Sequence, residues 1–385
     1  MMTTKRLLDV CDFQGGTQPP KDEWINDPCE GYVRMLQIRD YSQGDAKFIQ
    51  YVKDTKKLHK CTKDDIMLSR YGYIGQAFIG LEGAYNVALV KVIKKAEIHT
   101  PYLLCYFQSY YFQHFLLSNV GARATIPGFN KDELENALIR IPEMCEQIEI
   151  ASKITKVDEL IGFHKQQLNV LDTLIKSRFI EMFGTLSCNE HHYPMCALKY
   201  ACRKITDGKH GGCEQEYNSG YYYVGAREIY DGEIHYGTAP QIVRGDFEKD
   251  YRRCNIEQGD FVLVNTGATI GKSAIAKHPL TERTLLQKSV AMFKVKTELI
   301  SAVFLKCCYD ANPEMYTVKS ASAQPNLLLS RINSTQIYLP PIELQRQFAA
   351  FVEQVDKSKF YIVQMQILLR LLIRAIQQKT TEVLL

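Results

Sequence analysis

One sequence pattern occurs twice in this chain, as DDIMLSRYGYIGQAFI (residues 64–79) and as GDFVLVNTGATIGKSAIA (residues 259–276). In both copies a run of strand-forming residues leads into a short turn that contains two glycines, and a second such run follows. Glycine adopts the left-handed backbone of tight turns without steric cost. We therefore predict a β-hairpin with a glycine turn in each copy.

Further matches between the two halves of the chain follow in the same order. NVALVKV (residues 86–92) corresponds to SVAMFKV (residues 289–295). Next, IPEMCEQIEIASKITKVD (residues 141–158) corresponds to LPPIELQRQFAAFVEQVD (residues 339–356). A series of matches that keeps its order along the chain indicates an internal repeat.

Single residues extend this alignment. Arg39 in LQIRDY stands opposite Arg227 in VGAREIY, and Asn130 stands opposite Asn326. The chain has 385 residues and a hydrophobic content of 46%, enough apolar material for more than one hydrophobic core. We predict that it consists of two copies of a unit of roughly 190 residues.

Each copy divides into a β-rich part and a long helix that begins at a proline. We predict a first domain over residues 1–141, a central helix within 142–188, a second domain over 189–339 and a terminal helix within 340–385. Inside the first domain, TPYLLCYFQSYYFQHFLLS (residues 100–118) is predicted as one helix. The predicted fold class is α+β.

Both long helices carry apolar residues at alternating spacings of three and four, the heptad pattern of a coiled coil. The predicted seam residues are Ile154, Val157, Ile161, Leu168, Leu171 and Ile175, then Val352, Val355, Ile362, Leu369 and Ile373. Polar residues at His164, Lys359 and Gln366 either set the register or face solvent. About forty residues make a helix of about 60 Å. We predict an antiparallel two-helix spacer between two similar domains, with approximate twofold symmetry.

The Gly-Lys-Ser at the end of the second turn suggests a phosphate-binding P-loop. That loop needs four residues between its first glycine and the Gly-Lys-Ser, whereas Gly267 and Gly271 enclose one fewer. The first copy has Gln76 where the second has Lys272. A shared turn is therefore favoured, and a P-loop nucleotide-binding enzyme stays the alternative.

Composition and motifs exclude several other classes. Methyltransferase, protease and kinase motifs are absent. His191, His192, Cys196 and Cys202 match no standard zinc pattern. Twelve cysteines without a signal peptide predict free thiols in a reducing cytoplasm. Without a run of eighteen apolar residues we predict no membrane span, and a net charge of +4 permits a nucleic-acid partner.

With its repeat, hairpins and long helices, the chain resembles the DNA-specificity subunit of a type I restriction–modification system. The resemblance covers essentially the whole chain. Besides the second hairpin, it rests on SASAQPNLLLSRINSTQIYLPPIELQRQFAAFVEQVD (residues 320–356) and KSKFYIVQMQILLRLLIRAIQQKTTEVLL (residues 357–385). The first copy departs from the pattern, since Pro142-Glu143 replaces the double proline.

The resemblance implies two target-recognition domains, each reading one half of a bipartite, asymmetric site in double-stranded DNA. The chain itself would have no catalytic residue and no bound cofactor or metal. Its implied partners in the prokaryotic cytoplasm are two copies of an adenine methyltransferase that uses S-adenosylmethionine, and an endonuclease and translocase that uses ATP and Mg²⁺. A related phage-defence methyltransferase system and a coiled-coil scaffold without a DNA role are the alternatives.

Base edges are read by Arg, Lys, Asn and Gln side chains, and other polar groups contact phosphates. The candidates for DNA contact lie in hairpin and glycine-rich loops. They are Arg39, Arg70, Tyr71, Tyr73, Gln76 and Arg123 in the first copy, and Lys209, His210, Arg227, Asn265, Thr266, Thr269, Lys272 and Gln324 in the second. For each of them, a polar surface residue without DNA contact is the competing interpretation.

Overall fold

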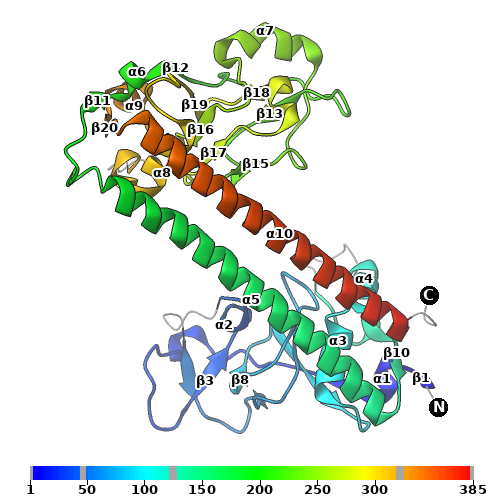
Figure 1. Cartoon of the computed structure of the whole chain (residues 1–385). Helices are drawn as coiled ribbons and strands as arrows, with labels where there is room; N and C mark the ends of the chain where they lie inside the picture. Colours follow the sequence, from blue (N-terminus) through cyan, green and yellow to red (C-terminus); the bar gives the residue numbers. More distant parts are fainter. Residues whose placement is uncertain (1–2, 44–48, 121–127, 318–324, 382–385) are drawn as a thin grey trace. The chain divides into compact units, whose positions relative to one another are not determined.

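The computed structural model describes residues 3–43, 49–120, 128–317 and 325–381 (Figure 1). The chain divides into two compact units. Unit 1 comprises Met1–Lys165 and Val363–Leu385, and unit 2 comprises Gln166–Ile362. Both long helices are therefore shared, with one part of each helix belonging to each unit.

The centre of unit 1 is a four-stranded antiparallel sheet in the order β2-β9-β6-β7. Its strands are β2 (Cys11–Gly15), β9 (Leu89–Lys94), β6 (Met67–Ser69) and β7 (Ala77–Phe78). The side chains of Phe13, Leu68 and Val92 enter a core that also contains Phe107 and Phe112. This sheet holds the first predicted hairpin, which β6 and β7 form.

A second sheet of unit 1 has the order β4-β3-β8-β5, in which β3 and β8 are parallel. Its strands are β4 (Tyr51–Lys53), β3 (Tyr32–Leu36), β8 (Gly83–Tyr85) and β5 (Lys60–Cys61). The remaining elements are β1 (Thr3–Arg6) paired with β10 (Leu138–Ile141), helices α1 (Leu7–Val10) and α2 (Ile38–Ser42), and the 3₁₀ turns η1 (Lys21–Glu23) and η3 (Asp132–Leu134).

The prediction of one helix over residues 100–118 is wrong. The structure has two helices there, α3 (Thr100–Phe107) and α4 (Tyr110–Asn119). Ser109 separates them, and its hydroxyl oxygen accepts a hydrogen bond from the Phe112 backbone N–H at 3.2 Å. A serine in extended conformation that satisfies a free N–H begins a new helix. The apolar periodicity continues across this break and conceals it.

Unit 2 repeats the topology of unit 1 with the sheet β12-β19-β16-β17 (Figure 1). Its strands are β12 (Cys202–Asp207), β19 (Val290–Val295), β16 (Phe261–Val264) and β17 (Ser273–Ile275). The parallel pair recurs as β13 (Tyr222–Val224) with β18 (Thr284–Leu286), and the terminal pair recurs as β11 (Met195–Ala197) with β20 (Gln336–Tyr338). The predicted α+β fold with an internal repeat is confirmed.

Other elements of unit 2 surround this framework. They are α6 (Leu198–Ala201), β14 (Ile229–Tyr230), β15 (Glu233–Ile234), α7 (Arg244–Cys254), η4 (Pro279–Arg283), α8 (Ala302–Ala311), η5 (Pro313–Met315) and α9 (Leu329–Ser334). The chain segment that carries α7 joins β15 to β16. The described part of unit 1 has no helix between β4 and β6, so α7 distinguishes the two modules.

The long helices are α5 (Met144–Phe183) and α10 (Ile342–Thr381), which lie inside the predicted segments 142–188 and 340–385. Within unit 2 the end of α5 contacts the start of α10. The ring centroid of Phe348 lies 5.5 Å from that of Phe179 and 5.4 Å from that of Phe183. Asp172 and Lys359 form an ion pair between the same two helices. The two helices thus run in opposite directions there.

Side-chain exposure along both helices follows the heptad spacing. Ile154, Val157, Ile161, Val352 and Val355 are buried. The remaining predicted seam residues are half-buried, namely Leu168, Leu171, Ile175, Ile362, Leu369 and Ile373. Most side chains between the seam positions are exposed. The polar residues His164, Lys359 and Gln366 share this half-buried state.

A buried glutamine joins each long helix to its own unit. In unit 1 the Gln147 side chain accepts from His99 N–H at 3.0 Å and donates to Pro142 O at 2.9 Å. In unit 2 the Gln345 side chain accepts from Ser301 N–H at 2.9 Å and donates to Leu299 O and Pro340 O. Since the two glutamines are equivalent in the repeat, the run Glu-Leu-Gln-Arg serves to anchor a helix.

Helix α10 is long and apolar enough to cross a membrane, by length and composition alone. A single helix of this kind is weak evidence for a membrane span, because the buried core helix of a soluble protein and a signal sequence pass the same test. The start of α10 supplies Phe348 and Val352 to the core of unit 2. Most of the later apolar side chains of α10, Leu368 among them, are exposed.

Candidate DNA interface

The predicted DNA-contact loops meet at one edge of the central sheet in each unit. In an antiparallel sheet the end of one strand lies beside the start of its neighbour. The end of β2, the start of β9 and the β6–β7 turn therefore share an edge. We call residues 16–18, 70–76 and 86–88 the first loop edge. Arg70 N–H donates to Ala88 O at 2.8 Å, and Gly16 N–H donates to Leu89 O at 3.1 Å.

The second loop edge is the equivalent surface of unit 2 and comprises residues 208–213, 265–272 and 287–289. Asn265 N–H donates to Ser289 O at 2.9 Å, and Gly208 N–H donates to Val290 O at 3.1 Å. These bonds reproduce the pairing of the three loops in unit 1. The duplication of a loop edge, and of the sheet behind it, yields two surfaces with the same strand framework, a second glycine turn that is one residue longer, and different side chains.

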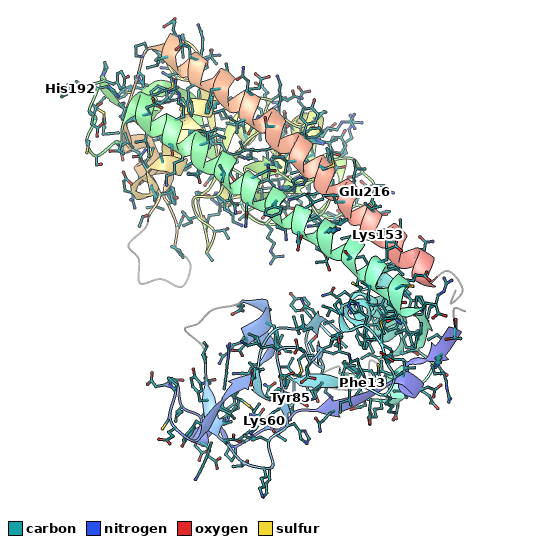
Figure 2. The ribbon with its side chains drawn as sticks, turned by 60° about the horizontal axis from the view of Figure 1, so that its bottom comes forward. Phe13, Lys60, Tyr85, Lys153, His192 and Glu216 are labelled. Carbon is teal, nitrogen blue, oxygen red and sulfur yellow. The ribbon has the colours of Figure 1, made fainter. Side chains whose placement is uncertain are left out.

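Close backbone packing explains one glycine at each edge. A Cβ atom on Gly16 would lie 2.1 Å from Asn86 O, and a Cβ atom on Gly208 would lie 2.1 Å from Leu286 O. No side chain fits at such distances. The Tyr85 hydroxyl, on the strand that enters this loop, donates to Gln14 Oε1 at 3.0 Å and holds β8 against β2 (Figure 2).

Both glycine turns are the predicted hairpin turns. Gly72 and Gly75 have φ of +72° and +78°, and Gly267 and Gly271 both have φ of +98°. Lys272 is followed directly by strand β17, whereas a P-loop lysine begins a helix whose N–H groups bind phosphate. The P-loop interpretation is therefore wrong.

A segment from later in the chain contacts each hairpin through an isolated β-bridge, residues 128–130 in unit 1 and 325–326 in unit 2. The Arg70 guanidinium donates to Phe129 O at 3.1 Å and to Asn130 Oδ1, and lies over the Tyr71 ring. In unit 2, Thr266 Oγ1 donates to Asn326 Oδ1 at 3.1 Å, and Gly267 N–H donates to Pro325 O at 3.0 Å. Arg70 and Thr266 thus hold the turns in place, and Pro325 and Asn326 have a structural role in unit 2.

These contacts correct one position of the repeat alignment. Tyr71 forms a β-bridge with Gly128, and the matching Thr266 forms one with Asn326. Gly128 is therefore the counterpart of Asn326, and the match of Asn130 with Asn326 is wrong by two residues. Arg123 and Gln324, which precede these segments, lie outside the described residues.

The candidates in the turns differ in how far they reach the surface. Tyr73 is 82% exposed, and Gln76 and Lys272 are also exposed, while Thr266 and Thr269 are half-buried. Asn265 is only 3% exposed, and its Oδ1 has no hydrogen-bond partner among the residues described. The Asn265 side chain consequently faces the interior and is not presented to a ligand.

The basic candidates in the other loops of unit 2 lie close to carboxylate groups. The Lys209 side chain is 14% exposed, and its ammonium group lies 2.6 Å from Asp250 on α7. That hydrogen bond raises the pKa of Lys209 above its ordinary value. His210 Nε2 lies 3.5 Å from Asp207 Oδ2, and Arg253 of α7 pairs with the same carboxylate.

Arg39 and Arg227 sit beside the edges, after the strands β3 and β13. Asn86 N–H donates to Leu36 O, and Gln287 N–H donates to Val224 O, which joins these strand ends to the loop edges. Arg39 donates to Gln50 Oε1 at 2.7 Å, whereas Arg227 is exposed.

Two basic residues at the loop edges were not predicted as candidates from the sequence. Lys288 is exposed on the second loop edge and forms no ion pair with any residue that the structure describes. His59 Nδ1 lies 2.6 Å from Gly15 O beside the first loop edge. The lysine-rich run before His59 could have drawn attention to it, but nothing in the sequence indicated that Lys288 adjoins the hairpin.

No group of three His, Cys, Asp or Glu residues suited to a metal ion occurs in the described ranges. All twelve cysteines are free, and Cys202 is buried with a pKa raised to about 12 by that burial. The exposed side chains of the loop edges carry amide, aromatic and cationic groups.

Residues 1–173 and 204–371 match the family model described as "Type I restriction modification DNA specificity domain". The chain belongs to the type I restriction–modification DNA specificity family. It is 25% identical over 371 residues to the type I restriction enzyme MjaVIII specificity subunit of Methanocaldococcus jannaschii, covering 91% of this chain and 85% of that protein.

Solved structures of this family share the fold. The S subunit of a type I restriction–modification system from M. genitalium matches with a TM-score of 0.52 and 15% identity, covering 99% of this chain and 96% of the other. A chain described under "complex assembly" and "conformational transition of the type I R-M system" matches with a TM-score of 0.60 and 16% identity, covering 98% and 97%.

Proposed function

We propose that this specificity subunit reads a bipartite, asymmetric target in double-stranded DNA, with one half-site on each loop edge. The observation that carries the proposal is the duplicated edge, which keeps its strand framework and loop pairing and changes its exposed side chains. Two similar modules in one protein suit two half-sites on one duplex, as two subunits do in dimeric DNA-binding proteins.

The exposed side chains of the two loop edges are suited to different bases. The first turn presents Tyr73 and Gln76, and the second presents Thr269 and Lys272. Glutamine suits adenine and lysine suits guanine in the major groove. The module with α7 has a further surface that the other lacks, so the target is asymmetric.

Each unit also carries several exposed apolar side chains on its parts of the long helices, which we propose form one apolar patch. In unit 1 this patch comprises Leu160 and Phe163 of α5 with Met365, Leu368 and Leu372 of α10. Phe163 is 59% exposed and Leu368 is 58% exposed. Large exposed apolar groups at heptad spacing are typical of a helix surface that binds a partner.

The corresponding patch of unit 2 comprises Val170 and Leu174 of α5 with Tyr361 of α10. Val170 is 64% exposed and Tyr361 is 72% exposed. We propose that each patch binds one copy of an adenine methyltransferase, which gives two copies per chain. Methylation with S-adenosylmethionine, and cleavage and translocation with ATP and Mg²⁺, would belong to the partner subunits in the prokaryotic cytoplasm.

Selection of binding sites from random duplexes tests this function. The chain is bound to its methyltransferase, and retained duplexes are sequenced through several rounds. The expected result is two enriched blocks of different sequence, separated by a gap of constant length and no sequence preference. A single enriched block would contradict the two-edge account, and no enrichment at all would favour a scaffold without a DNA role.

A further inference from the structure

Tyr73 is the most exposed large side chain of the first loop edge. It stands at the tip of the β6–β7 turn, 82% exposed. Its side chain makes no hydrogen bond or ring contact with the residues that the structure describes. Removing an aromatic ring from water is favourable, and a ring that stays exposed does not gain this free energy. An exposed ring in this position is therefore typical of a contact that forms on binding.

The backbone beneath this ring is held firmly. The buried Ser69 hydroxyl donates to Tyr73 O and accepts from Gln76 N–H at 2.9 Å. Gly75 N–H donates to Ser69 O at 2.7 Å. Little backbone freedom therefore remains to be lost when the ring binds a ligand, and only the two side-chain torsions of Tyr73 have to be fixed.

Helix α4 supports the same turn from behind. Gln113 Nε2 donates to Gly75 O at 2.7 Å, and a Cβ atom on Gly75 would lie 2.5 Å from Leu116. The turn is thus held against α4, while the Tyr73 side chain stays exposed. A rigid backbone with a free aromatic tip is suited to insertion between stacked groups.

The surroundings of Tyr73 favour a nucleic-acid base over a protein surface. Its exposed neighbours in the turn are Gly72 and Gln76, which add no apolar area. The apolar patches suited to proteins lie on α5 and α10. Base stacking on an aromatic ring contributes about 1–3 kcal/mol per base and is tolerant of sequence. The second turn carries Ala268 and Thr269 in this place and so has no such ring.

We propose that Tyr73 is a base-stacking wedge, which enters the half-site read by unit 1 and packs against a base that it unstacks from its neighbour. The inference rests on the proposed function, because it requires the first loop edge to face DNA. With a wedge of this kind, the affinity for DNA depends on the energy needed to unstack a base step, and also on contacts with the base edges. The described residues of the second glycine turn include no aromatic side chain that could make the same contact.

Duplex binding and permanganate footprinting of the chain with its methyltransferase test the wedge, using a duplex that contains the selected target. Permanganate oxidises unstacked thymines, so thymines are placed at successive positions of the first half-site. We expect one reactive position besides any base that the methyltransferase itself displaces. Tyr73→Ala should abolish that reactivity and weaken binding about tenfold, which corresponds to about 1.4 kcal/mol.

Two variants control for shape and folding. Tyr73→Phe keeps the ring and should retain both the reactivity and an affinity within about twofold of the wild type. Thr269→Ala in the second turn should leave the reactivity of the first half-site unchanged. If the wild type binds the duplex but Tyr73→Ala has the same footprint and affinity, the wedge is wrong and the proposed function stands. If the wild type binds no duplex, both fail.

Discussion

At the scale of single residues, the two glycine turns depend on positions where a side chain has no room. Gly271 combines a φ of +98° with a Cβ position 2.3 Å from the Tyr316 ring. Gly75 has the same two constraints against Leu116. The sequence predicted these turns because the glycines recur in both copies. It did not predict the neighbours, since Tyr316 and Leu116 lie far along the chain from the turns.

Gly271→Ala should therefore destabilise unit 2. A left-handed alanine costs about 1 kcal/mol, and displacement of the Tyr316 ring adds about 1–2 kcal/mol. We expect the midpoint of thermal unfolding to fall by several degrees. Gly237→Ala is the matched control, since no atom lies within 4 Å of the added Cβ and the φ of Gly237 is not positive. Equal midpoints for both variants would contradict this packing.

Gln345 attaches the start of α10 to unit 2 through side-chain hydrogen bonds. Its side chain is fully buried and makes three hydrogen bonds to backbone groups. Gln345→Leu leaves those groups unsatisfied and should lower the free energy of unfolding by about 2–4 kcal/mol. Denaturant unfolding of the chain measures it. The exposed Gln354→Leu on the same helix should change it by less than about 0.5 kcal/mol.

At the scale of elements, the helix seam was readable from its spacing, whereas the partners of particular side chains were not. The pattern of threes and fours runs through α5 and α10, and side-chain burial follows it. Arg70 and Lys209 were predicted as DNA contacts because they are basic residues in loops. The structure engages Arg70 with Phe129 O and Lys209 with Asp250. Such long-range pairs depend on the fold, which the local sequence does not reveal.

A polar layer interrupts the seam within unit 1. His164 Nδ1 and Gln366 Nε2 are buried without a hydrogen-bond partner in the described structure. The heptad spacing brings these two residues to one level of the antiparallel pair. Burying unpaired polar atoms costs stability, and in coiled coils such a layer fixes register.

His164→Leu combined with Gln366→Leu should therefore stabilise the helix pair. Removal of about 1 kcal/mol of desolvation cost raises the unfolding midpoint by about 1 °C in a chain of 385 residues. Calorimetry of the purified chain measures the change. The control Gln364→Leu replaces an exposed glutamine on the same helix and should have little effect. A lower midpoint for the double variant would mean that the polar pair is satisfied in solution.

The apolar helix patches predict how partners assemble. Phe163→Asp with Leu368→Asp places two charges in the patch of unit 1, which should remove one of two methyltransferase copies. Val170→Asp with Tyr361→Asp should remove the other. Light scattering of the purified complex gives the stoichiometry. Gln364→Asp, outside both patches, should retain two copies, and retention of both copies by either double variant would contradict this docking.

At the scale of the whole molecule, the order of the matched segments was sufficient to predict the fold class and the repeat. The central sheet, the parallel strand pair and the terminal strand pair each occur once in either unit, as that duplication requires. The loop edges could be located only in part, because Arg39 and the Gly16 loop join the hairpin through strands whose pairing is not local. The identity of the target bases depends on side-chain placement in those loops.

The central claim is that each loop edge reads one half of the target, and genome-wide mapping of adenine methylation tests it most directly. Host cells would express the methyltransferase with this chain, or with a chain whose residues 1–141 come from another family member. We expect one bipartite, asymmetric motif for the native chain, and a change in a single half of that motif for the swapped chain. A change in both halves, or a motif without a gap, would contradict it.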